Sequence, residues 1–73
     1  MNKYKGYADA KLITIILGEL YGKYTSGIAI MADEDTQTYY VSFRYLHSIP
    51  DEFPTELLEV KIVTEQRDIA VAL

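Results

Sequence analysis

The chain has 73 residues, 49% of them apolar, and contains no cysteine. This length fits one domain with a modest core and excludes disulfides and cysteine-based zinc sites. The longest apolar run, residues 12–17, is interrupted by Thr14 and is far shorter than the roughly 20 residues of a membrane-spanning helix. The N-terminus lacks a signal-peptide pattern. We therefore expect a single cytoplasmic domain that covers residues 1–73.

The formal net charge is −4, and it is unevenly distributed. Residues 1–24 carry four lysines and two acids, whereas residues 25–73 carry three basic and nine acidic residues. A nucleic-acid-binding domain usually has a basic footprint, and most of this chain shows the opposite. An acidic surface steers a protein towards basic partners, but it can also serve solubility alone. The charge therefore favours a protein partner and leaves open a surface without one.

Residues 9–24 can be read as a helix or as a strand. The helix would have Asp9 as its cap, Gly27 after its end, and one apolar stripe made of Leu12, Ile13, Ile16, Leu17, Leu20 and Tyr24. Three isoleucines and a threonine favour a strand, and Gly18 and Gly22 would each cost a helix about 1 kcal/mol. We prefer the helix because the stripe persists over about four turns.

The runs 28–32 and 38–46 have the pattern of two strands separated by a polar turn. A loop of two or four residues places Ile30 opposite Val41 and gives one wholly apolar face. A shift by one residue would place Ile30 opposite Ser42 and mix the two faces. We therefore expect an even-length hairpin whose tip carries Asp33, Glu34 and Asp35. The core side of the second strand would consist of Tyr39, Val41, Phe43 and Tyr45.

Two prolines interrupt the segment 47–59, so no long element can cross it. A short helical turn is expected at 55–59, with Thr55 as its cap. The runs 60–64 and 68–73 are expected to pair around Gln66 and Arg67. The fold class that results is α+β, with one N-terminal amphipathic helix packed on a four-stranded, mostly antiparallel sheet. The alternative is a small all-β barrel, if residues 11–17 form a strand.

The residue types argue against most catalytic and metal chemistry. Residues 33–37, DEDTQ, alternate like the start of a calcium loop, but no turn glycine follows and the twelfth position is Arg44 instead of glutamate. His47 is the one histidine, and the chain has neither a cysteine nucleophile nor a phosphate-binding glycine loop. We therefore expect a protein that is not an enzyme, with no catalytic residue, no metal and no cofactor.

The tyrosines and the acidic residues are the candidate interaction features. Tyrosine is enriched at protein interfaces, although a small sheet also needs aromatic residues in its core. We assign Tyr24, Tyr39 and Tyr45 to the core. Four acids without an intervening basic residue form a negative edge beside Phe53. The candidate partner-binding residues are Tyr40, Arg44, Asp51, Glu52, Phe53, Glu56 and Glu59.

These features predict a non-enzymatic interaction module, a small acidic inhibitor or regulator that binds a basic surface of a partner protein, for instance a nucleic-acid-handling enzyme. Two alternatives stay open: a nucleic-acid-binding module that uses Tyr40, Arg44 and the N-terminal lysines, and a structural homo-oligomer. A homodimer would form through the run 68–73 or through the helix face that bears Gly18 and Gly22. The composition, short, acidic and rich in tyrosine, is typical of small phage or mobile-element proteins.

Overall fold

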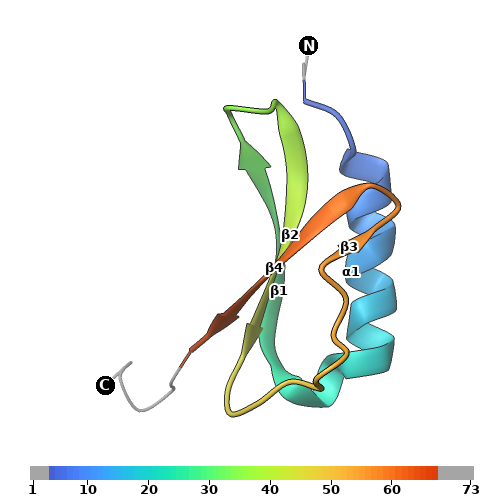
Figure 1. Cartoon of the computed structure of the whole chain (residues 1–73). Coiled ribbons are helices and arrows are strands. Elements are labelled where there is room, and N and C mark those ends of the chain that lie inside the picture. The colour runs from blue at the N-terminus through green and yellow to red at the C-terminus, as the bar shows by residue number, and fades with distance from the viewer. Residues whose placement is uncertain (1–3, 68–73) are drawn as a thin grey trace.

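The computed structural model of the chain describes residues 4–67, and Figure 1 shows one helix lying along a twisted sheet. The elements in chain order are α1 (Tyr7–Tyr21), the 3-10 helix η1 (Gly22–Tyr24), β1 (Thr25–Asp33), β2 (Thr38–Tyr45), β3 (Glu56–Leu57) and β4 (Val60–Gln66). The sheet has the strand order β1-β2-β4-β3 and is not closed into a barrel. The expected α+β fold is confirmed, and the all-β alternative is wrong because residues 11–17 are helical.

The sheet is mixed. The pairs β1–β2 and β3–β4 are antiparallel, whereas β2 and β4 are parallel. Within residues 4–67 the fourth strand is β3. The expected pairing of the run 68–73 lies outside the described residues. The expected helical turn at 55–59 is wrong. Thr55 does not cap a helix, because its carbonyl accepts a hydrogen bond of 2.9 Å from the N–H of Ile62 and so holds the segment to β4.

The helix starts and ends earlier than expected. Gly6 is the residue before α1 and has a φ of 91°, which a glycine adopts readily. Its carbonyl accepts a hydrogen bond of 2.8 Å from the N–H of Ala10, so Gly6 begins the helix and Asp9 lies within the first turn. The chain leaves α1 after Tyr21 through η1, well before Gly27.

The buried stripe of α1 differs from the expected one. The residues without exposed surface are Ala10, Ile13 and Leu17, whereas Leu12 is 47% and Leu20 is 64% exposed. Apolar residues occur on more than one side of α1, and a sheet on one side covers only one stripe. Gly18 lies in α1 and Gly22 directly follows it at the start of η1, and both glycines are exposed.

The β1–β2 hairpin has the expected register, with Ile30 opposite Val41 and Ile28 opposite Phe43 across a four-residue loop, 34–37. Val41 and Phe43 are fully buried and form one core with the stripe of α1 and with two residues of β4, Val60 and Ile62. Ser42, which lies outside the expected core side of this strand, is also buried, with 8% of its surface accessible. The reason is that β2 is an inner strand with β1 and β4 on its two sides.

Candidate functional site

The side of the sheet that faces away from α1 forms one continuous surface. Successive side chains of a strand point to opposite sides, and residues opposite each other in paired strands share a side. The side chains on this surface, which we call the open face, are Ala29, Met31, Tyr40, Ser42, Arg44, Lys61, Val63 and Glu65. Two predicted binding residues, Tyr40 and Arg44, are therefore on the same surface. Met31 and Val63 expose 39% and 41% of their area there.

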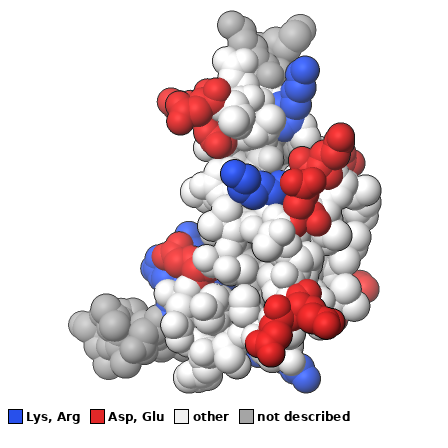
Figure 2. Space-filling model, in the orientation of Figure 1, with Lys and Arg blue, Asp and Glu red and all other residues white. Residues whose placement is uncertain are grey.

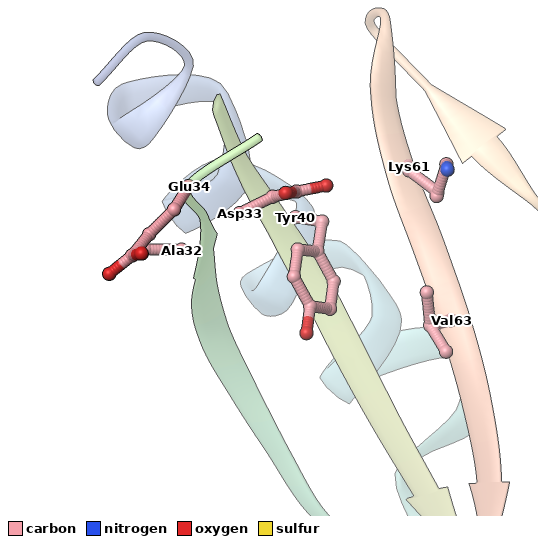
Figure 3. A pocket seen from close by; sticks show the side chains of 6 residues that line it. All are labelled: Ala32, Asp33, Glu34, Tyr40, Lys61 and Val63. Atoms are coloured by element: carbon pink, nitrogen blue, oxygen red, sulfur yellow. The ribbon is translucent and has the colours of Figure 1, made fainter. Parts of the chain in front are cut away.

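The open face ends in a hollow of about 350 Å³ that opens to solvent. Figure 3 shows the ring of Tyr40 between the end of β1 and the side chains of Lys61 and Val63 on β4. Asp33 and Glu34 line the other wall. The Asp33 carboxylate accepts a hydrogen bond of 3.0 Å from the N–H of Asp35, so it also stabilises the hairpin tip. The hollow is thus a mixed polar and aromatic contact surface.

Arg44 is the second predicted binding residue on the open face. It lies between Gly27 of β1 and Glu65 of β4 in the sheet register. Its Nε atom is buried, and no described residue accepts a hydrogen bond from it. A buried donor without an acceptor costs free energy, so the fold holds this Nε at a cost.

The predicted acidic residues lie along the chain from the loop before β3 to the turn after it. We call this set the acidic strip; its members are all exposed and are Asp51, Glu52, Glu56 and Glu59. Figure 2 shows two groups of acidic side chains on the side where β3 and its preceding loop run in Figure 1. Glu56 lies opposite Lys61, so the strip borders the open face. In residues 4–67 the ion pair within 4 Å is Arg67–Glu65, which leaves the strip without an ion-pair partner there.

Phe53, predicted to be the apolar residue of this edge, packs inwards. Its ring centroid lies 4.6 Å from that of Phe43 and 4.8 Å from that of Tyr21. These are distances of packed aromatic pairs. Phe53 is therefore a half-buried core residue, and Tyr21 packs against the core as well.

The apolar residue that the strip does expose is Leu58, which the sequence reasoning missed. It is 54% exposed in the two-residue turn between β3 and β4. Leu58 and Glu59 have φ angles of 50° and 65°. Two-residue hairpin turns of type I′ require such angles, and Asn-Gly provides them at low cost. A hairpin could have been predicted from Leu57 and Val60, two apolar residues separated by two turn residues. Because neither turn residue is glycine or asparagine, the segment resembles a helical turn instead.

Two of the N-terminal lysines, Lys11 and Lys23, do not lie near Tyr40 and Arg44. Lys11 lies on α1, which covers the opposite side of the sheet. Lys23 lies in η1, and its Nζ is 5.3 Å from the centroid of the Tyr24 ring. The chain therefore does not place these two lysines on the open face.

Comparison with protein-family models, curated proteins and solved structures found no match to this chain. Within residues 4–67, no helix is long and apolar enough to cross a membrane. The same residues contain no group of three or more histidine, aspartate or glutamate side chains placed to hold a metal ion. The candidate site therefore depends on the geometry of the open face and the acidic strip.

Proposed function

We propose that this chain is a non-enzymatic protein-interaction module that binds a basic surface of a partner protein through the acidic strip and Leu58. The observation that carries the proposal is the 54% exposure of Leu58 in a left-handed turn between the exposed side chains of Glu56 and Glu59. An apolar side chain surrounded by charged residues is the usual arrangement of an interface anchor and its polar rim.

The stability of the fold does not explain this turn. Leu57 packs against the core, whereas Leu58 is mostly in solvent and contributes little burial. Asn-Gly at positions 58 and 59 would meet the φ requirement with less strain. Residues in a strained backbone conformation that brings no gain in packing are expected at functional positions. The side chains of Leu58 and Glu59 are therefore best explained by a contact with another molecule.

The charge of the strip defines the class of partner. Glu56 and Glu59 would pair with lysine or arginine beside the Leu58 contact, and Asp51 and Glu52 would attract the same surface at longer range. Enzymes that handle nucleic acids carry basic surfaces that bind phosphates. Carboxylates along one edge would occupy such a surface in place of phosphates, which suits an inhibitor or regulator of an enzyme of this kind.

The variant Leu58→Asn/Glu59→Gly tests the proposal. Parent and variant are immobilised side by side for affinity capture from the native host, and the captured protein is identified, purified and measured by calorimetry. The parent should bind a basic protein, and the variant should lose at least about tenfold in affinity, or 1.4 kcal/mol. The control Leu12→Asn removes an exposed leucine from α1 and should bind like the parent. Equal affinity of the turn variant and the parent would exclude Leu58 and Glu59 as contacts of the interface.

A second candidate function is nucleic-acid binding on the open face. The placement of Arg44 favours it, because this basic residue shares the open face with Tyr40 and Lys61. Against it, Glu65 lies on the same face and Asp33 and Glu34 line its hollow. A gel-shift titration with single-stranded and duplex oligonucleotides separates the candidates. Binding that Arg44→Ala weakens, and that the turn variant leaves unchanged, would favour the nucleic-acid function.

A further inference from the structure

The strand β1 forms one outer edge of the sheet, at the opposite end from β3. It pairs with β2 along one side, and no described residue pairs with it along the other. The register shift between Thr25 and Gly27 is confined to one end, and the pairing from Gly27 to Asp33 is regular. A long outer strand presents a row of N–H and C=O groups that another strand can pair with.

Apart from the irregularity between Thr25 and Gly27, the edge of β1 lacks the features that usually keep outer strands unpaired. Its sequence, TSGIAIMAD, has no proline and no lysine, and no charged residue precedes Asp33. The other edge has such features, because β3 is two residues long, bears Glu56 and ends in the left-handed turn. The two edges therefore differ in their readiness to accept a further strand.

We infer that β1 pairs with β1 of a second copy of this chain, antiparallel about a two-fold axis at Ala29, so that the two sheets become continuous. Ala29 is the midpoint of Thr25–Asp33, and an axis there pairs the regular stretch 27–31 of one copy with that of the other. The acidic strip lies at the opposite edge of each sheet, so this inference is independent of the proposed function and a dimer would present two strips.

The charge of the strand is compatible with a second copy and sets the orientation of the pair. In the antiparallel arrangement, Asp33 faces the uncharged Thr25 of the second copy. A parallel arrangement in register would place the two Asp33 side chains side by side, which is unfavourable. The remaining residues of β1 are uncharged, so they oppose their own copies without repulsion.

The side chains also match across this axis. On the helix side, Ile28 lies opposite Ile30 of the second copy, and both residues are only half-buried in the single chain. On the open face, Gly27 lies opposite Met31 of the second copy, so the small residue leaves room for a side chain that is 39% exposed. Pairing would therefore bury apolar surface on both sides of the new strand pair.

Charge reversal at the axis tests the arrangement. The variants Ala29→Lys and Ala29→Glu each place two like charges opposite each other, whereas their equimolar mixture places opposite charges there. Analytical ultracentrifugation over about a hundredfold range of concentration should give a parent mass of twice 8.3 kDa at the upper end. Each single variant should dissociate at least about tenfold more readily, and the mixture should recover the dimer.

The control is Ala8→Lys, which makes the same change at an exposed alanine of α1 and should dimerise like the parent. Circular dichroism confirms that each variant is folded. Because the chain has no cysteine, Ala29→Cys gives an independent readout: mild oxidation should cross-link it into a covalent dimer, and Ala8→Cys should stay uncross-linked. A parent that is monomeric throughout the concentration range, or a mixture that recovers no dimer, would overturn the inference. A foreign peptide that binds the edge of a monomeric parent would identify another occupant.

Discussion

Phe43 is the side chain on which the core depends most. It is fully buried on the inner strand β2, opposite Ile28 on one side and Thr64 on the other, and its ring packs against Phe53. Phe43→Ala should lower the free energy of unfolding by about 3–5 kcal/mol, a large part of the stability of a small domain. Urea unfolding followed by circular dichroism measures this. Val63→Ala on the open face should change stability by only about 0.5 kcal/mol, and an unchanged midpoint for Phe43→Ala would contradict the core assignment.

Gly6 and Gly22 flank α1 and should respond in opposite directions to alanine. Gly6 has a φ of 91°, and a Cβ there would meet Val60 Cγ2 at 3.9 Å, so the cost is one of backbone conformation and not of a clash. Gly6→Ala should destabilise the fold by about 1–2 kcal/mol. Gly22 has a φ of −55° and open space around its Cα, so Gly22→Ala should be neutral or stabilising by up to about 1 kcal/mol. Thermal unfolding of the two variants under one condition provides the comparison, and an equal loss in both would refute the role of φ at Gly6.

Buried residues could be predicted where the apolar pattern of the sequence selects one face of an element. They could not be predicted where apolar residues occur on several faces. The alternation in β2 identified Val41 and Phe43, because a shift by one residue would have buried polar side chains. The apolar residues of α1 populate several sides, so the helical period does not select the buried stripe, and Leu20 was misassigned. Phe53 was misassigned because it follows Pro50 in a segment that is neither helix nor strand, so no alternation of apolar residues indicates which side it faces.

The β3–β4 turn is an element whose sequence opposes its conformation. Replacing Leu58 by asparagine and Glu59 by glycine should stabilise the fold by about 1–2 kcal/mol, because these residues adopt left-handed φ angles more readily. Leu58 is mostly exposed, so little packing is lost. Glu59→Gly alone should give about half of the gain. The denaturant midpoint measures the effect, and a lower midpoint for the double variant would show that Leu58 packs against the fold.

The elements that carry strong local signals were predicted, and those without them were not. The β1–β2 hairpin was located with its register, since two alternating runs surround a polar loop. The helix was identified over most of its length because its apolar spacing persists. The strand β3 was missed because Glu56 and Leu57 favour helices, and a two-residue strand has no period of its own. Its pairing with β4 is a tertiary contact that the local sequence does not encode.

At the scale of the whole molecule, the sheet has two chemically different edges. The edge at β1 is uncharged up to Asp33, and the edge at β3 carries the acidic strip. The exposure of the acids was predictable, because carboxylates without basic neighbours rarely leave water. The position of Glu56 opposite Lys61, at the border of the open face, could not be predicted, because it results from the pairing of β3 with β4.

The acidic strip should act on the rate of association more than on the stability of the fold. The double variant Glu52→Lys/Glu56→Lys reverses two exposed charges, so circular dichroism and the unfolding midpoint should stay close to those of the parent. Its association with the proposed basic partner should be at least about tenfold slower at low salt, and the dependence of the rate on salt should flatten. Stopped-flow mixing at several salt concentrations measures both quantities.

The matched control for this prediction is Glu19→Lys/Asp35→Lys, which changes the net charge equally at exposed positions on α1 and at the hairpin tip. A long-range effect of net charge would slow both double variants alike, whereas a docking role of the strip slows the first one more, because close charge pairs contribute most to steering. Equal rates for Glu52→Lys/Glu56→Lys and the parent would place the interface elsewhere, and the open face with Tyr40 and Arg44 would then be the surface to vary next.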